Sequence, residues 1–156
     1  MQTTSSLEEL IAGHPFLSGM ERRFHHFFNE CGTLRRFSSG QQIFHEGGVA
    51  DHFYLILDDQ VALETFVPGL GMARIQTLGS GDPLGWSWIF PPCQWQFSAS
   101  TLKPTEVISF DAAVLRCRAD SDLEFRDQLL KRMSRTLVQR LQGTRMQLVD
   151  LYGMRP

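Results

Sequence analysis

The sequence is short of cysteine, of long apolar runs and of net charge, and each shortage narrows the possible functions. Its three cysteines, Cys31, Cys93 and Cys117, are an odd number at wide spacing, which fits neither a disulfide framework nor the paired ligands of a zinc site. No apolar run approaches membrane-spanning length, and the N-terminus lacks a basic region followed by an apolar stretch. The net charge of −2 supplies no global positive field for nucleic acid. We therefore expect reduced thiols in a soluble, cytoplasmic protein that has no membrane partner.

Patterns for catalysis and metal binding are missing as well. The sequence has no glycine-flanked nucleophilic serine, no pair of carboxylates in a pocket-like context and no metal-ligand spacing. The adjacent His25 and His26 point about 100° apart on a helix, so they cannot chelate one ion from one face. We predict that the chain is not an enzyme, that it has no catalytic residues and that it holds no metal.

The 156 residues suffice for one domain, because 42% of them are apolar and 12 Phe and 3 Trp are available for a core. Residues 5–31 are expected to form N-terminal helices. Ser5 or Ser6 caps a first helix that Gly13 and Pro15 end, and a second helix is expected from Ser18 or Gly19 to about Cys31. The whole chain, 1–156, is interpreted as a single domain.

Residues 33–111 change to short apolar or alternating runs separated by turn residues such as Ser38-Ser39-Gly40 and Pro68-Gly69. Many short strands at regular spacing indicate a roll or barrel, so the fold class is mainly β with α, a jelly-roll or double-stranded β-helix. The expected strands are Leu34–Phe37, Gln42–Phe44, Phe53–Leu57, Val61–Phe66, Met72–Leu78, Phe97–Leu102 and Glu106–Phe110.

Residues 112–153 are predicted to be helical, with a short turn near Ala112–Leu115 and a long helix from Asp122 to about Tyr152. This helix carries a regular seam with alternating steps of four and three residues, which is typical of a coiled coil. We favour a homodimer through the seam over a helix folded back on its own domain. The seam residues are Leu130, Ser134, Leu137, Leu141, Thr144, Leu148 and Leu151.

Three stretches resemble the cyclic-nucleotide-binding domains of the Crp/Fnr (catabolite activator protein) family. The first is the run from Gly40 to Leu57, with its order Gly-x-x-Ile-Phe, x-x-Gly and Ala-Asp-x-Phe-Tyr-x-Ile. The second, Leu78–Gly85, looks like the entry to that family's phosphate-binding cassette. The third, Arg140–Thr144, resembles its dimer helix, including the threonine that approaches the nucleobase. The resemblance covers about residues 5 to 153 and implies a β-roll closed by a long C-terminal helix.

In this family the cassette binds the cyclic phosphate with backbone N–H groups and an arginine, and the ribose with a glutamate. Here Trp86 stands at the position of the glutamate, and Trp95 or Gln96 at that of the arginine. Between Gly81 and Thr101, Asp82 is the only charged residue. The resemblance places a degenerate ligand site at Gly85, Trp86, Ser87, Trp88, Trp95, Gln96, Ser98, Thr144 and Arg145.

Loss of the arginine is expected to weaken binding of a cyclic phosphate by about ten- to a hundredfold, because a hydrogen bond to a charged group contributes about 1.5–3 kcal/mol. Arg145 on the closing helix, or Arg74 on a neighbouring strand, could replace it. The ligand therefore stays open: cAMP or cGMP is possible although the cassette lacks both charged residues.

Aromatic residues have replaced the polar ones, namely Trp86, Trp88, Phe90, Trp95 and Phe97. In one interpretation these side chains fill the family's nucleotide pocket and the fold binds no ligand. In the other they line a pocket whose shape suits a flatter or less charged ligand. Weak cyclic nucleotide binding is a third reading. Haem, which some relatives bind, is a minority view, because no residue matches a haem motif; its candidate axial ligands are His14, His45, His52, Cys31 and Cys93.

The predicted function is a non-enzymatic regulatory or sensor domain used in signalling or transcription control. One alternative is a protein-interaction scaffold with a filled pocket. Another is the sensor half of a Crp/Fnr-type transcription regulator. Such regulators carry a helix-turn-helix module after the dimer helix, whereas this chain ends three residues after Gly153. We therefore expect a stand-alone domain that does not bind DNA by itself.

Overall fold

A computed structural model describes residues 6–153 of the chain. The chain divides into two compact units, Met1–Arg118 and Ala119–Pro156. The first unit contains the N-terminal helices and all strands, and we call it the roll; the second contains the long helix α4 (Leu123–Gly153). Ser5, one of the two predicted caps, lies outside the described residues.

Helix α1 (Leu7–Gly13) begins at the predicted cap Ser6, whose Oγ accepts a hydrogen bond from the backbone N–H of Glu9 at 3.2 Å. Helix α2 (Arg22–Cys31) begins later than Ser18 or Gly19, so that part of the prediction is wrong. The reason is a tight turn between the helices, in which the carbonyl of His14 accepts the N–H groups of both Leu17 and Ser18.

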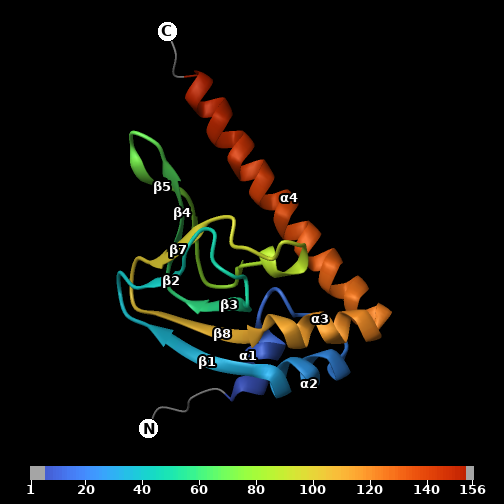
Figure 1. Ribbon diagram of the computed structural model, residues 1–156. Helices are drawn as coiled ribbons and strands as arrows, with labels where there is room; N and C mark the ends of the chain where they lie inside the picture. Colours follow the sequence, from blue (N-terminus) through green and yellow to red (C-terminus); the bar gives the residue numbers. More distant parts are fainter. Residues whose placement is uncertain (1–5, 154–156) are drawn as a thin grey trace. The chain divides into compact units, whose positions relative to one another are not determined.

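Two antiparallel four-stranded sheets form the roll (Figure 1). Apart from the hairpin of β4 and β5, strands that are neighbours in space are not consecutive in sequence, as in a jelly roll, and the predicted fold class is confirmed. The first sheet has the order β1 (Gly32–Phe37), β8 (Thr105–Asp111), β3 (His52–Asp58) and β6 (Pro83–Leu84). The second has the order β2 (Gln42–Phe44), β7 (Ser98–Thr101), β4 (Val61–Val67) and β5 (Gly71–Leu78).

Strand β3 lies at the centre of the core. Four consecutive residues of this strand are buried, namely Phe53, Tyr54, Leu55 and Ile56. The strand is therefore covered on both faces, which explains why its sequence is continuously apolar. Phe53 packs against Phe16 of the segment that joins α1 to α2, with ring centroids 5.6 Å apart. The N-terminal segment therefore covers one face of the first sheet.

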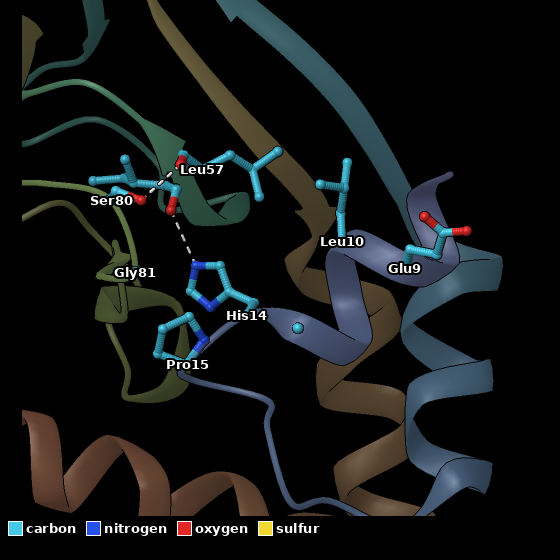
Figure 2. Close-up of a pocket in the computed structure, with 9 residues that line it drawn as sticks. Glu9, Leu10, His14, Pro15, Leu57, Ser80 and Gly81 are labelled. Atoms are coloured by element: carbon cyan, nitrogen blue, oxygen red, sulfur yellow. Dashed lines mark hydrogen bonds between the residues drawn. The ribbon is translucent and has the colours of Figure 1, made fainter. Parts of the chain in front are cut away.

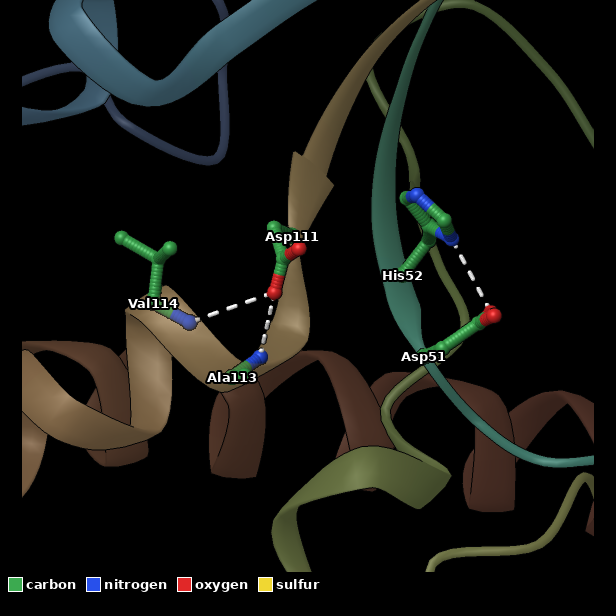
Figure 3. Close-up of polar contacts among 5 residues, drawn as sticks. All are labelled: Asp51, His52, Asp111, Ala113 and Val114. Carbon is green, nitrogen blue, oxygen red and sulfur yellow. Dashed lines mark hydrogen bonds and ion pairs between the residues drawn. The ribbon is translucent and has the colours of Figure 1, made fainter.

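Helix α3 (Ala112–Ser121) follows β8 without a loop. Figure 3 shows its cap: an Oδ1 atom of Asp111 accepts the backbone N–H groups of Ala113 at 2.8 Å and of Val114 at 3.3 Å. The expected short turn near Ala112–Leu115 is thus a helix of 10 residues.

Helix α4 spans 31 residues, which agrees with the helix predicted from Asp122 to about Tyr152. The side chain of Asp122 accepts a hydrogen bond from the N–H of Phe125 at 3.1 Å, which confirms the predicted N-cap. Across residues 6–153, none of the helices combines the length and the apolar character that a membrane crossing demands.

Candidate functional site

Gly85 begins the candidate site, directly after strand β6. Its φ of +84° is in the left-handed region, which a glycine adopts without strain. A Cβ atom at this position would lie only 2.7 Å from Cζ3 of Trp95. Trp86 then precedes a single 3₁₀ turn, η1 (Ser87–Ile89). Backbone conformation and close packing both require glycine here.

Trp88 is fixed in the core of the roll. Its side chain is 1% exposed, and its ring centroid lies 5.8 Å from that of Phe53. Its carbonyl accepts a hydrogen bond from Nη1 of Arg116 at 3.0 Å and one from Sγ of Cys93 at 3.4 Å. The buried indole N–H has no partner among the described residues. Trp88 therefore anchors the cassette, although the sequence grouped it with the ligand-binding residues.

Trp95 is stacked on Phe44, with ring centroids 3.8 Å apart and an angle of 12° between the planes. Phe44 is stacked in turn on Tyr54 at 6.3 Å, and Tyr54 on His52 at 6.0 Å. These four rings, which we call the ring ladder, run from the cassette across β2 to β3. Sequence reasoning did not assign Phe44 or Tyr54 to the site, although both lie in the run Gly40–Leu57.

Backbone hydrogen bonds fasten the cassette to the loop between β2 and β3. The N–H of Trp95 donates to the carbonyl of Gly48, and its own carbonyl accepts from Gly47, both at 2.8 Å. Oγ of Ser98, which is buried, accepts the N–H of Glu46 at 2.9 Å. The carboxylate of Glu46 accepts the hydroxyl of Thr65 at 3.0 Å. The site is thus assembled from three separate stretches of the chain.

The aromatic residues of the cassette do not form one cluster. Trp88 and Trp95 are buried, whereas Phe90 is 63% and Phe97 is 38% exposed. Trp86 and Ser87 are half-buried, and Gln96 is exposed. Of the two positions proposed for the missing arginine, only Gln96 presents its side chain to solvent.

Arg74, one of the two candidate replacement cations, is exposed on β5. It pairs across the sheet with Glu64 of β4, which pairs with Ser98 of β7, so the three side chains share one face. With strands about 4.8 Å apart, the Cα of Arg74 is roughly 10 Å from that of Ser98. Glu64 lies between them in the strand register.

The other predicted ligand residues, Thr144 and Arg145, are both exposed on α4. Oγ of Thr144 donates to the carbonyl of Arg140 at 3.1 Å, a bond within the helix. Several leucines of the predicted seam are exposed too: Leu141 is 69%, Leu148 is 51% and Leu151 is 59% exposed. Leu130 and Leu137 are 37% and 41% exposed, and Ser134 is also exposed.

A concavity of about 210 Å³, shown in Figure 2, lies between α1 and the turn that precedes β6. His14 at its wall is buried, and both of its ring nitrogens are engaged with the backbone. Nε2 donates to the carbonyl of Ile56 at 3.0 Å, and Nδ1 accepts the N–H of Phe16 at 3.1 Å. Burial lowers the pKa of His14, so the ring is neutral.

Three other candidate haem ligands, His52, Cys93 and Cys31, are placed by the structure as follows. Nδ1 of His52 lies 2.9 Å from a carboxylate oxygen of Asp51 (Figure 3), and the thiol of Cys93 donates to Trp88. Burial raises the pKa of the Cys31 thiol to about 11, so this thiol stays protonated. Within residues 6–153, no three or more His, Cys, Asp or Glu side chains gather in a way that could hold a metal ion.

Comparison with known proteins gives concordant results. The sequence model of the cyclic nucleotide-binding domain matches residues 34–120. A CRP-like cAMP-activated global transcriptional regulator of Mycobacterium tuberculosis is 30% identical over 115 residues, which is 74% of this chain and 50% of the regulator. The chain therefore spans about half the length of the curated relatives it matches.

Solved structures share the fold at lower identity. A Geobacter metallireducens protein assigned to cyclic nucleotide binding superposes with a TM-score of 0.77 at 22% identity, over 88% of this chain and 99% of its own. A cyclic nucleotide-binding domain from Methylobacillus flagellatus gives a TM-score of 0.77 at 16% identity, over 93% and 82% of the two chains. These likenesses establish the β-roll and its long helix.

Proposed function

The chain belongs to the cyclic nucleotide-binding domain family, and from that premise we propose that it is a non-enzymatic regulatory domain with a ligand site at Gly85–Ser98. The observation that supports this most directly is the cassette backbone. Gly85 has a left-handed conformation and leads into η1, and the exposed Gln96 is, with Trp95, one of the two positions at which the family's arginine is expected. This turn supports a ligand frame that lacks the family's charged groups.

The replaced side chains favour a ligand of low charge. Asp82 is the only charged residue between Gly81 and Thr101, so the cassette itself offers no cation to a phosphate. The half-buried Trp86 and the exposed Phe97 offer flat apolar surface, which suits a planar group. We expect cyclic nucleotides to bind about ten- to a hundredfold more weakly than in a domain that has the arginine.

Restoring the arginine tests this assignment. Gln96→Arg should strengthen cAMP binding by about ten- to a hundredfold, because it supplies a charge-assisted hydrogen bond to the phosphate. Isothermal titration with cAMP and cGMP up to millimolar concentration measures the change. Gln60→Arg, which places the same charge at an exposed position next to β4, serves as the control. If Gln96→Arg and the wild type both fail to bind at millimolar ligand, the ligand is not a cyclic nucleotide.

We further propose that α4 joins two copies of the chain and carries the state of the site to a partner. A helix with Leu141, Leu148 and Leu151 more than half exposed leaves a large apolar stripe in contact with water. Pairing of two such helices along the seam buries these leucines. Sedimentation at increasing protein concentration would detect this dimer, and Leu148→Ala should weaken it.

A protein-interaction scaffold is the second candidate, and the burial of Trp95 at 4% exposure favours it. In this case the indole fills the old pocket and the roll binds a partner instead of a ligand. Trp95→Ala separates the two functions. If Trp95 is a wall of an open site, ligand binding is lost; if it is a plug, the substitution opens a cavity and creates binding that the wild type lacks.

A third candidate is the sensor half of a transcription regulator. The Mycobacterium tuberculosis relative is a cAMP-activated transcriptional regulator, and this chain matches half of its length. The intact mass of the natural gene product tests this candidate: a mass near 17.8 kDa would argue against a fused DNA-binding module.

A further inference from the structure

Helix α4 carries two arginines beside its seam at positions that face a second copy. In the heptad set by the seam, Leu141 and Leu148 occupy a positions and Thr144 occupies a d position. Arg140 directly precedes Leu141 and is therefore at g, and Arg145 directly follows Thr144 and is at e. Side chains at e and g flank the contact between two paired helices.

Arg145 has no acidic neighbour along its own helix. The positions three and four residues away, which lie next to it on the helix surface, are Leu141, Gln142, Leu148 and Val149. Lys131, also at an e position, differs in this respect, because its Nζ lies 3.1 Å from the carboxylate of Asp127. No acidic residue occurs between Asp127 and Asp150, so the charged residues that flank the distal seam are basic.

In a parallel pair of helices, a g residue faces the e residue that follows five positions later on the other chain. Arg140 of one copy then faces Arg145 of the partner subunit, and the two-fold axis repeats the contact. Two like-charged contacts oppose a dimer that the leucines favour. A doubly charged oxyanion between the guanidinium groups removes this opposition, since each arginine presents a planar fork that matches phosphate oxygens.

We propose that the paired α4 helices bind phosphate-type oxyanions between Arg140 of one copy and Arg145 of the partner subunit, so that dimer formation depends on such an anion. This inference rests on the proposed dimer and adds to it a ligand class and a mode of regulation. The site is formed by α4 alone, independently of what occupies the cassette.

Sedimentation velocity over a dilution series tests the proposal with the full chain. The dimer dissociation constant is measured in sodium chloride and in sodium pyrophosphate at equal ionic strength. We expect pyrophosphate to tighten the wild-type dimer by about tenfold beyond chloride, because general screening is the same in both salts. Arg145→Glu turns each repulsive contact into an attractive one, so it should tighten the dimer in chloride by about tenfold and abolish the pyrophosphate effect.

Arg135→Glu is the matched control, because Arg135 is exposed on α4 one residue after the a position Ser134, away from the e and g positions. This variant should keep the pyrophosphate effect. Arg140 is left unchanged because it makes other interactions.

Equal dissociation constants in the two salts, or a weaker dimer in Arg145→Glu, would overturn the anion site. A dimer that forms in chloride and is loosened by Leu148→Ala would still support the proposed assembly in that case. A chain that stays monomeric under all conditions would refute both.

Discussion

The roll and helix α4 use the same kinds of apolar residue for different purposes. In the roll, Leu55 and Ile56 are completely buried, so their burial energy stabilises the fold of this chain. In α4, Leu141 and Leu148 are more than half exposed, and their burial energy is available for association. The comparison teaches that the roll is stabilised by contacts within this chain, whereas the exposed leucines of distal α4 contribute little to its stability.

Charge follows the same division. The roll, residues 1–118, has 12 acidic and 8 basic residues, whereas residues 119–156 have 5 acidic and 7 basic residues. The two units therefore differ in the sign of their net charge, and the unit that contains α4 is the one suited to anionic ligands. A single melting temperature for the whole chain would not distinguish the two units, so the tests below compare one substitution in each unit.

The largest expected contrast comes from truncating one apolar residue in each unit. Phe53→Ala should lower the free energy of unfolding by about 3–5 kcal/mol, because the side chain is fully buried among Phe16, Trp88 and Phe110. Leu148→Ala should change it by less than about 1 kcal/mol in a dilute, monomeric sample. Urea titration followed by circular dichroism measures both.

Phe53→Leu, which leaves a smaller cavity, keeps this prediction testable if Phe53→Ala fails to fold. Equal losses of unfolding free energy for Phe53→Ala and Leu148→Ala would contradict the division between a buried core in the roll and an exposed apolar face on α4.

The same glycine-to-alanine change should have opposite signs in the two units. Gly85→Ala is expected to destabilise by about 2 kcal/mol, because the residue has φ +84° and its new Cβ would lie 2.7 Å from Trp95. Gly143→Ala should stabilise α4 by about 0.5–1 kcal/mol, since a Cβ there meets nothing within 4 Å and alanine is the better helix former. Thermal unfolding of each variant supplies the comparison; a stabilising Gly85→Ala would show that the cassette turn is not constrained as described.

Most of the fold could be predicted from the sequence, because turn glycines and alternating runs mark the strand ends. The predicted run Val61–Phe66 differs from β4 by one residue, and the long helix was expected within one residue of its observed ends. Strand β6 was missed, since Pro83–Leu84 is too short to show a period. The late start of α2 was missed because it depends on hydrogen bonds to the carbonyl of His14, which composition does not reveal.

The candidate site was less predictable. The sequence identifies the aromatic residues of the cassette but does not say which of them are buried. Trp95 is buried and its ring is stacked on Phe44 of strand β2. Phe90 is exposed, although it is also an apolar aromatic residue. Whether such a residue is buried or exposed depends on contacts with residues distant in sequence, and the local sequence pattern does not reveal these contacts. The sequence placed Gly85 in the ligand site, but it gave no sign that the close approach of Trp95 also requires a glycine there.

The smallest expected effect is a pH dependence confined to the roll, since all five histidines precede α4. Burial lowers the pKa of His14 below its ordinary value of 6.5, so the folded chain binds fewer protons than the unfolded chain in mildly acidic solution. The contribution of His14 to stability is therefore fully present above about pH 6.5 and is lost as the pH falls toward the lowered pKa. The free energy of unfolding should decrease between pH 7 and 5, by at most about 1.4 kcal/mol per pH unit from this residue.

Urea titrations at several pH values measure this slope, and His14→Gln should flatten it. His45→Gln, which replaces an exposed histidine of the roll, should leave it nearly unchanged. Protonation of His14 would also cost the hydrogen bond from the N–H of Phe16 to Nδ1, which orders the segment between α1 and α2 where the ring of Phe16 packs on Phe53 of β3. That segment is therefore expected to loosen first on acidification, while the helicity of α4 persists. Simultaneous loss of roll and helix signals at every pH would show instead that the two units unfold as one.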